Sequence, residues 1–162
     1  MQVNIQIDAI DTRILMALTT DSRRSYADVA AEVGLSTAAV HERVKKMGER
    51  GVIERFSLRV NHEKVGLHVT AFVAIRNDGG IHCRDVAPAL RRMPEVLELH
   101  SVAGEYDFIA KVRTSHPRGL EEVLYRIKAI SGVARTTSTV VLNTEFEDLP
   151  MRLGPVGREP TG

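Results

Sequence analysis

The sequence predicts an α+β fold, in which an N-terminal domain of three helices precedes a βαββαβ, ferredoxin-like domain. Apolar residues recur at helical spacing up to residue 50, and after Gly51 they alternate as in a strand. Between residues 67 and 142, strand and helix patterns follow one another in the order strand, helix, strand, strand, helix, strand. The expected parts are a helical domain, a strand with a linker, a second domain and a flexible tail, at residues 1–52, 53–66, 67–148 and 149–162.

Two helices open the N-terminal domain. The first is predicted from about Ile7 to Thr19, because apolar residues share one of its faces: Ile10, Ile14, Ala17 and Leu18. Ser25 can cap the second helix, and Asp28 follows it at the spacing of a capping box. Gly34 is expected to end this helix, because glycine adopts the left-handed conformation of a helix terminus without steric cost.

A third helix is predicted from Thr37 to about Arg50, with Ser36 as its cap and an apolar stripe at Val40, Val44 and Met47. Its other side starts with small uncharged residues and continues into cations. Two short helices broken by Gly-Leu-Ser, with such a surface on the second, are typical of a helix-turn-helix that binds the major groove of DNA. The residues expected at the DNA are Ser25, Ser36, Thr37, Ala38, His41, Glu42, Arg43, Lys45 and Lys46.

Residue types on the third helix indicate how DNA would be contacted. Thr37 and His41 can form hydrogen bonds to base edges, and Ala38 can contact a thymine methyl group. The cations Arg43, Lys45 and Lys46 are better suited to phosphates, which position a protein without reading sequence. An ordinary helical hairpin with a solvated charged face is the alternative interpretation.

Positive charge is concentrated in this part of the chain. The formal net charge of the chain is only +1. Between Ser36 and Arg59, however, the sequence contains six Lys or Arg residues and only three Asp or Glu residues. Residues 61–162 contain thirteen of each and are balanced. One such patch binds DNA weakly, so the pattern favours a dimer with two DNA-binding domains.

The second half begins with a strand pattern in residues 52–60 and a linker in residues 61–66, with a turn at Asn61-His62. Six elements follow: strand 68–75, helix 82–92, strand 96–102, strand 107–113, a helix opened by Ser115 and Pro117, and strand 133–142. Two helices cover one face of such a sheet. The other face keeps alternating apolar residues, and a second subunit is its simplest cover.

Two segments of this domain are candidates for binding a small molecule. The hairpin Val102–Asp107 contains Gly104, whose backbone amide can face an anion, and Asp107, which can accept from an ammonium group. Further along, Thr136 and Ser138 share one face of a strand and can bind a polar ligand together. A plain hairpin turn and simple β-propensity are the alternative explanations.

Several classes of function are disfavoured. Only 4% of residues are aromatic and Trp is absent, so binding of single strands by base stacking is not expected. The six histidines are scattered, and no nucleotide-binding or nucleophile motif is found, which predicts no catalytic site, metal or cofactor. The lone Cys83 indicates a reducing compartment. With neither a secretory signal nor an apolar stretch of membrane-spanning length, a cytoplasmic protein without a membrane partner is expected.

Taken in order, these motifs resemble the Lrp/AsnC, or feast/famine, family of bacterial and archaeal transcription regulators over residues 7–148. The resemblance is carried by IDAIDTRILMAL, by residues 29–36 and 40–47, by Gly51-Val52-Ile53 and Val65-Gly66-Leu67, and by Pro94-Glu95-Val96, residues 102–107 and residues 136–142. It implies double-stranded DNA as a partner and dimers that assemble into tetramers, octamers or larger rings. It also implies an amino acid or a related metabolite bound between neighbouring dimers.

The family's Gly-Asp-Tyr-Asp loop falls on residues 104–107 and its Thr-x-Thr motif on residues 136–138. Glu105 replaces the first Asp, and Ser138 replaces the second Thr, where the lost methyl group can alter ligand choice. The effector site implied in this way contains Ala103, Gly104, Glu105, Tyr106, Asp107, Thr136 and Ser138.

The leading hypothesis is therefore a sequence-specific transcription regulator whose DNA binding or oligomeric state responds to an amino acid or related metabolite. A ligand-independent protein that organises DNA through the same helices is an alternative. A small metabolic enzyme with a ferredoxin-like domain is a remote one, disfavoured by the missing catalytic residues.

Overall fold

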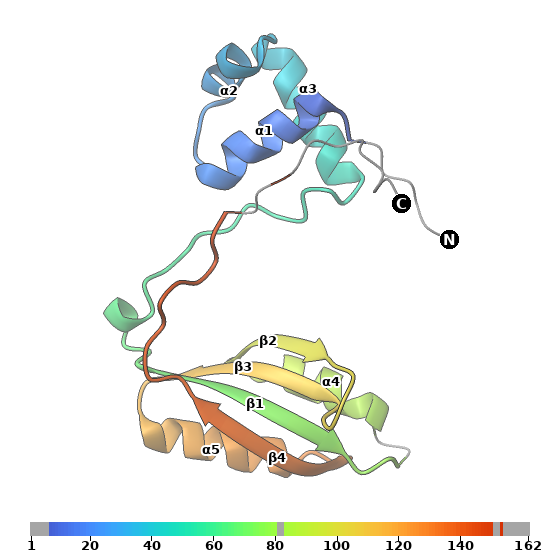
Figure 1. The fold of residues 1–162 in the computed structure, drawn as a ribbon, viewed down its shortest axis with the longest axis vertical. Helices are drawn as coiled ribbons and strands as arrows, with labels where there is room; N and C mark the ends of the chain where they lie inside the picture. The colour runs from blue at the N-terminus through green and yellow to red at the C-terminus, as the bar shows by residue number, and fades with distance from the viewer. Residues whose placement is uncertain (1–6, 81–82, 151–152, 154–162) are drawn as a thin grey trace, which may run out of the picture. The chain divides into compact units, whose positions relative to one another are not determined.

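The computed structural model describes residues 7–80, 83–150 and 153, which form two compact units (Figure 1). The head unit contains the described residues up to Arg59 and those from Phe146 onward. The sheet unit contains Val60–Glu145.

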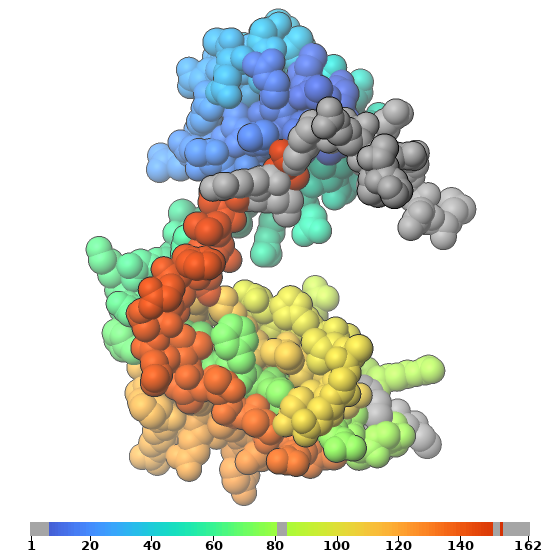
Figure 2. All heavy atoms as spheres, viewed as in Figure 1, coloured from blue at the N-terminus to red at the C-terminus, as the bar shows by residue number. Residues whose placement is uncertain are grey.

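Three helices build the head unit: α1 (Ala9–Thr20), α2 (Tyr26–Val33) and α3 (Thr37–Glu49). The apolar stripes expected from the sequence are confirmed as its core, apart from Ile10, which is only partly buried. The blue to cyan atoms of these helices form one continuous packed body in Figure 2. The buried apolar residues are Ile14, Leu15, Ala17, Leu18, Val29, Ala30, Val33, Val40, Val44 and Met47.

The caps and the turn between α2 and α3 are also confirmed. Ser25 accepts a hydrogen bond from the Asp28 backbone N–H at 3.1 Å, and Ser36 accepts from that of Ala39 at 3.2 Å. Gly34 ends α2 with φ of 76°, in the left-handed region where a side chain is unfavourable. These local interactions set where α3 begins and thus which of its residues face outward.

The strand expected over residues 52–60 is not formed. Val52 and Ile53 turn back onto α3, where their N–H groups donate to the Met47 carbonyl at 2.9 and 3.2 Å. Residues 54–61, which we call the connector, have neither helix nor strand. A strand needs a neighbour for its backbone hydrogen bonds, and no described strand pairs with this segment. Its alternating apolar side chains remain exposed, with exposed fractions of 53%, 84% and 41% for Phe56, Leu58 and Val60.

The sheet unit has the expected βαββαβ order. A short 3₁₀ turn, η1 (Glu63–Val65), lies within the predicted linker. The four strands pair in the order β2-β3-β1-β4, and all neighbours are antiparallel. The elements are β1 (Val69–Asn77), α4 (Cys83–Arg91), β2 (Val96–Ser101), β3 (Phe108–Thr114), α5 (Pro117–Lys128) and β4 (Val133–Val140).

The predicted first residue of the α4 segment, His82, lies outside the described residues. Helix α5 is capped by His116, whose Nδ1 accepts from the Gly119 N–H at 2.9 Å, and not by Ser115. Pro117 follows at the first helical position, where it requires no hydrogen-bonded N–H group.

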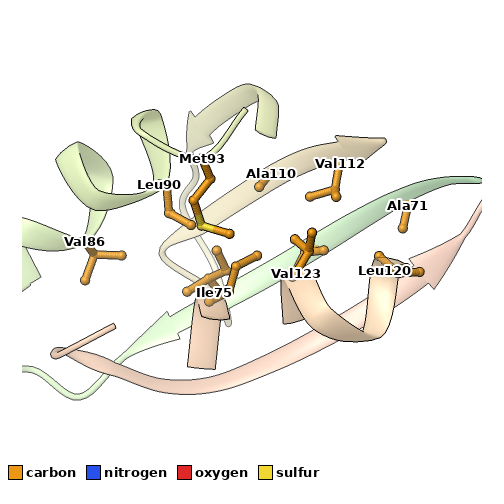
Figure 3. Packing of buried hydrophobic residues seen from close by; sticks show 11 residues of the cluster. Ala71, Ile75, Val86, Leu90, Met93, Ala110, Val112, Leu120 and Val123 are labelled. Carbon is orange, nitrogen blue, oxygen red and sulfur yellow. The ribbon is translucent and has the colours of Figure 1, made fainter. Parts of the chain in front are cut away.

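One face of the sheet is covered and the other is open. Helices α4 and α5 pack on the face formed by Ala71, Val73 and Ile75 of β1 with the corresponding residues of β3, as Figure 3 shows. On the opposite face lie Phe72, which is 43% exposed, and the charged pair Lys111 and Glu98, with 3.0 Å between Nζ and Oε1. The covered core contains Ala71, Val73, Ile75, Val86, Leu90, Met93, Ala110, Val112, Leu120, Val123 and Ile127.

Candidate DNA-binding surface and effector site

Helix α3 presents a polar side to solvent. The stripe that includes Val40 and Val44 is buried, whereas six of the expected DNA-contact residues of α3 are exposed and lie away from that stripe: Thr37, Ala38, His41, Glu42, Lys45 and Lys46. Small side chains stand at its N-terminal end and longer ones follow. This order allows the start of the helix to approach base edges closely.

His41 is held by an aromatic neighbour from α2. Its ring meets that of Tyr26 edge-on, with 5.8 Å between ring centroids and 64° between planes. This contact limits the directions in which His41 can point. Tyr26 was not among the predicted residues, because the contact joins two helices and leaves no local pattern.

The lysines of α3 form only weak ion pairs along their own helix. Lys45 Nζ lies 3.8 Å from Glu49, and Lys46 Nζ lies 3.5 Å from Glu42, and all four side chains are exposed. Such pairs contribute little free energy, so a DNA phosphate can compete for both ammonium groups.

Arg43 is engaged differently. Its Nη1 lies 2.7 Å from Asp8 Oδ2 and 2.7 Å from Asp11 Oδ1, both at the start of α1. The Asp11 backbone N–H and the Arg43 guanidinium hold the pKa of Asp8 below its ordinary value of 3.8. Two carboxylates of its own domain thus occupy Arg43, which favours a structural role over the expected phosphate contact.

Ser25 and Ser36 are exposed, but the hydroxyl of each already accepts a backbone hydrogen bond as a helix cap. Besides accepting from Asp28, the Ser25 hydroxyl donates to the Asp28 carboxylate at 2.6 Å. Both hydroxyls stand at helix N-termini, where unpaired N–H groups favour an anion such as phosphate. Their position is compatible with the predicted contacts.

In the sheet unit, the predicted effector loop forms the bend between β2 and β3. The Asp107 N–H donates to the Ile75 carbonyl at 2.9 Å, and its carboxylate accepts from the Asn77 N–H at 2.6 Å. Gly104 has φ of 138°, a conformation that other residues rarely adopt. Ala103, Gly104 and Glu105 are exposed at the tip, where a ligand can reach them.

The loop contacts β4 through Tyr106. Its hydroxyl lies 2.9 Å from Thr137 Oγ1. Thr136 and Ser138 stand opposite Ile75 and Val73 in the β1–β4 register and therefore share the face that carries the helices. The structure brings Thr137, and not the predicted Thr136 and Ser138, to Tyr106.

Asn77 has a side-chain oxygen that is buried without a hydrogen-bond partner. The residue ends β1, and its N–H binds the Asp107 carboxylate. A buried acceptor that lacks a donor costs free energy, and such atoms often belong to functional sites. No sequence pattern distinguishes Asn77, because its position depends on the irregular pairing of β1 with β4 at Arg76 and Asn77.

In the part of the chain that the structure describes, no three His, Cys, Asp or Glu side chains gather in a way that could hold a metal ion. Likewise, no helix among those residues has the length and apolar character needed to cross a bilayer.

Known families match both halves of the chain. The AsnC-type helix-turn-helix domain matches residues 7–47, and the Lrp/AsnC ligand binding domain matches residues 70–151. The chain belongs to the Lrp/AsnC family. The resemblance seen in the sequence is confirmed, and so is the α+β fold with its two expected parts.

Individual relatives agree with this assignment. LrpA of Mycobacterium tuberculosis is 38% identical over 146 residues, which cover 90% of this chain and 97% of LrpA. A crystal structure of LrpA from that organism has a TM-score of 0.81 and covers 88% of this chain and 97% of its own. E. coli AsnC also has a TM-score of 0.81, at 29% identity, with 91% of this chain and 97% of AsnC covered.

Similar structures include complexes with L-methionine. One of these is the feast or famine regulatory protein from M. tuberculosis, at 38% identity, a TM-score of 0.84 and coverage of 88% of this chain and 97% of its own. Both family models and the relatives are those of transcription regulators, so this Lrp/AsnC protein is a transcription regulator with DNA as its partner, and not an enzyme. The remote alternative of a small metabolic enzyme was therefore wrong.

Proposed function

We propose that this Lrp/AsnC protein regulates transcription as a homo-oligomer that binds operator DNA through α3 and responds to an amino acid at the loop 102–107. The polar side of α3 is the observation that carries the proposal. Its exposed small residues, followed by cations, match what a recognition helix needs in a major groove. Such a regulator acts where the DNA is, so we place it in the cytoplasm.

Base and phosphate contacts divide along α3. Thr37, Ala38 and His41 read base edges, and Lys45 and Lys46 exchange their weak intrahelical pairs for phosphates. In a symmetric dimer, two α3 helices bind successive major grooves of a pseudo-palindromic site, with half-sites about ten base pairs apart.

The open face of the sheet is the proposed dimer interface. It is a natural one because helices cover the other face, whereas Phe72 remains exposed among polar neighbours. The apolar side chains of the connector offer a further contact between copies. Dimers then associate into tetramers, octamers or larger assemblies that engage several DNA sites.

An amino acid has suitable partners near the loop 102–107. The Asp107 carboxylate, in the exposed loop, is an acceptor for its ammonium group. Backbone N–H groups near Gly104 are donors for its carboxylate. The L-methionine complex of the M. tuberculosis relative supports this class of ligand. If the effector binds one assembly more tightly than another, it shifts the protein toward that assembly. The resulting change in DNA affinity is limited by the difference between the effector's affinities for the two assemblies.

Operator affinity tests the DNA-binding part of the proposal. The operator is obtained by selecting, from a pool of random duplexes, the sequences that the protein binds most tightly. Thr37→Glu and Lys45→Glu place negative charge on the proposed surface and are expected to weaken operator binding at least tenfold. Met16→Glu, at an exposed position of α1, makes the same charge change as Thr37→Glu and should retain affinity. Unchanged binding in both α3 variants, with folding intact, would disprove the recognition helix.

The effector part is tested by a thermal-shift screen of all amino acids and common keto acids, followed by sizing and operator binding with each hit. A hit that changes assembly or operator affinity is the expected result. If no compound shifts the melting temperature, and operator and bulk DNA bind alike at fixed salt, the chain is a ligand-independent DNA-organising protein instead.

A further inference from the structure

The cations of the head unit divide into paired and unpaired groups. Arg43, Lys45 and Lys46 of α3 have acidic partners, and Arg13 and Arg24 both bind Glu32. Among described residues, the head-unit arginines whose side chains have no hydrogen-bond or ion-pair partner are Arg23, Arg50, Arg55 and Arg59. Three of these four follow the recognition helix within ten residues.

The connector also separates its charges from its apolar groups. Arg55, Ser57 and Arg59 alternate with Phe56, Leu58 and Val60, and all six are exposed. The basic and apolar residues alternate in sequence, so wherever the connector becomes extended they lie on opposite sides, one basic and one apolar. If the apolar side lies against a second copy, as proposed above, the basic side remains available. Glu54 is the single acidic residue between Arg50 and Arg59.

The connector starts at a fixed point of the recognition helix. The N–H groups of Val52 and Ile53 bind the Met47 carbonyl, and both side chains pack partly against the head core. Arg55 is two residues beyond this anchor and Arg59 is six. At roughly 3.3 Å per residue, Arg59 lies no more than about 20 Å along the chain from Ile53, which is less than one helical turn of DNA.

We propose that Arg55 and Arg59 form a second DNA contact, which binds phosphates beside the groove that α3 reads. The proposal rests on DNA binding by α3. Because the guanidinium groups contact the backbone and not the bases, they strengthen operator and bulk DNA alike. In a dimer, four such groups add to the electrostatic attraction that the largely paired α3 surface supplies.

Salt dependence tests this contact directly. Each neutralised phosphate contributes about 0.9 to the slope of log affinity against log salt concentration. Arg55→Gln/Arg59→Gln should therefore reduce the magnitude of the slope by about 1.8 per subunit, or about 3.6 for a dimer, on operator and random duplex alike. Arg55→Lys/Arg59→Lys should preserve it, since the charge is retained.

A matched control makes the same charge change elsewhere. Arg84→Gln/Arg91→Gln removes two exposed cations of α4 that have no described partner and should leave the slope unchanged. Sizing of each variant at the assay concentration is required, because the connector also carries the apolar contact. An unchanged slope in Arg55→Gln/Arg59→Gln, with assembly intact, would overturn this inference. If Thr37→Glu still weakens operator binding, DNA binding by α3 is retained even when the arginine contact is disproved. Failure of the arginine contact can therefore be distinguished from failure of the proposed function.

Discussion

Arg43 in the middle of the recognition helix is bonded to Asp11 in the first turn of α1, with 2.7 Å between Nη1 and Oδ1. The Asp11 side chain is only 12% exposed, and Arg43 also binds Asp8, which caps the same helix. The orientation of α3 on the head unit is therefore coupled to the N-terminus of α1. The proposed DNA-binding geometry of α3 thus depends in part on two aspartates at the start of α1, which precede the α2–α3 pair.

Loss of Arg43 is expected to destabilise the head unit. Arg43→Gln leaves the Asp11 carboxylate largely buried without its cation, which should cost about 1–2 kcal/mol of unfolding free energy, since the pair is partly solvated. Hydrogen exchange of α1 and α3 amides measures this loss in the whole protein. The matched Arg23→Gln variant, which removes an unpaired arginine, should exchange as the unchanged protein does, and equal protection in both variants would refute the coupling.

The same cluster predicts a pH dependence. The pKa of Asp8 is lowered, first by the Asp11 N–H and then by Arg43, so its stabilising contribution is complete above its unfolded pKa near 3.8. The contribution decreases as pH falls through the lower folded pKa. Asp8→Asn should therefore lower head stability at pH 6, and the difference should shrink toward pH 3. A difference that grows on acidification would contradict this sign.

Gly34 and Gly48 should respond in opposite directions to alanine. Gly34→Ala introduces a side chain at φ of 76° and should destabilise the head by about 1–2 kcal/mol. Gly48→Ala lies within α3 with open space around the added carbon and should stabilise it by about 0.5–1 kcal/mol. Urea unfolding followed by helical circular dichroism compares the two. Equal effects would mean that backbone conformation does not govern these sites.

Substitutions on the two faces of β4 should affect effector affinity differently. Thr137→Val removes the hydroxyl bonded to Tyr106 and should weaken effector binding severalfold, equivalent to about 1 kcal/mol. Thr136→Val makes the same chemical change on the helix-bearing face and should have a smaller effect. Calorimetric titration with a hit from the effector screen measures both. A larger loss in Thr136→Val would restore the original assignment from the sequence.

Phe72 is expected to hold the dimer together. Phe72→Lys places a charge at the centre of the open sheet face and should shift the protein toward monomer. Tyr125→Lys alters another exposed aromatic, on the solvent side of α5, and should preserve the dimer. Sedimentation over a range of concentrations detects the shift. Dimers of equal affinity in both variants would place the interface elsewhere.

Local patterns predicted most of the fold. The buried stripes of α1, α2 and α3 follow directly from helical spacing, and Gly34 marks the turn because few other residues tolerate its conformation. The connector is the segment where a local pattern was misleading. Alternating Phe56, Leu58 and Val60 indicate a strand, but strand formation depends on a partner that a local pattern does not reveal.

The candidate sites were predicted less completely because they depend on contacts between distant residues. Alternation places Thr136 and Ser138 on one face, but only the pairing with Ile75 and Val73 shows that this face carries the helices. In the same way, Arg43 resembles any exposed cation of a recognition helix until Asp8 and Asp11 are brought next to it. The loop 102–107 was a candidate because of Gly104 and Asp107, and the family resemblance supported it, whereas Asn77 belongs to no motif.

The connector is anchored at its start and irregular beyond it, and these two properties determine which half-site spacings a dimer can bind. Once one α3 is seated, the other head of a dimer is a tethered ligand, whose local concentration depends on the length and stiffness of two connectors. Half-site spacing is then tolerated within the reach of the tethers and rejected beyond it. Inserting or deleting one connector residue would therefore change the preferred spacing without altering a single base contact.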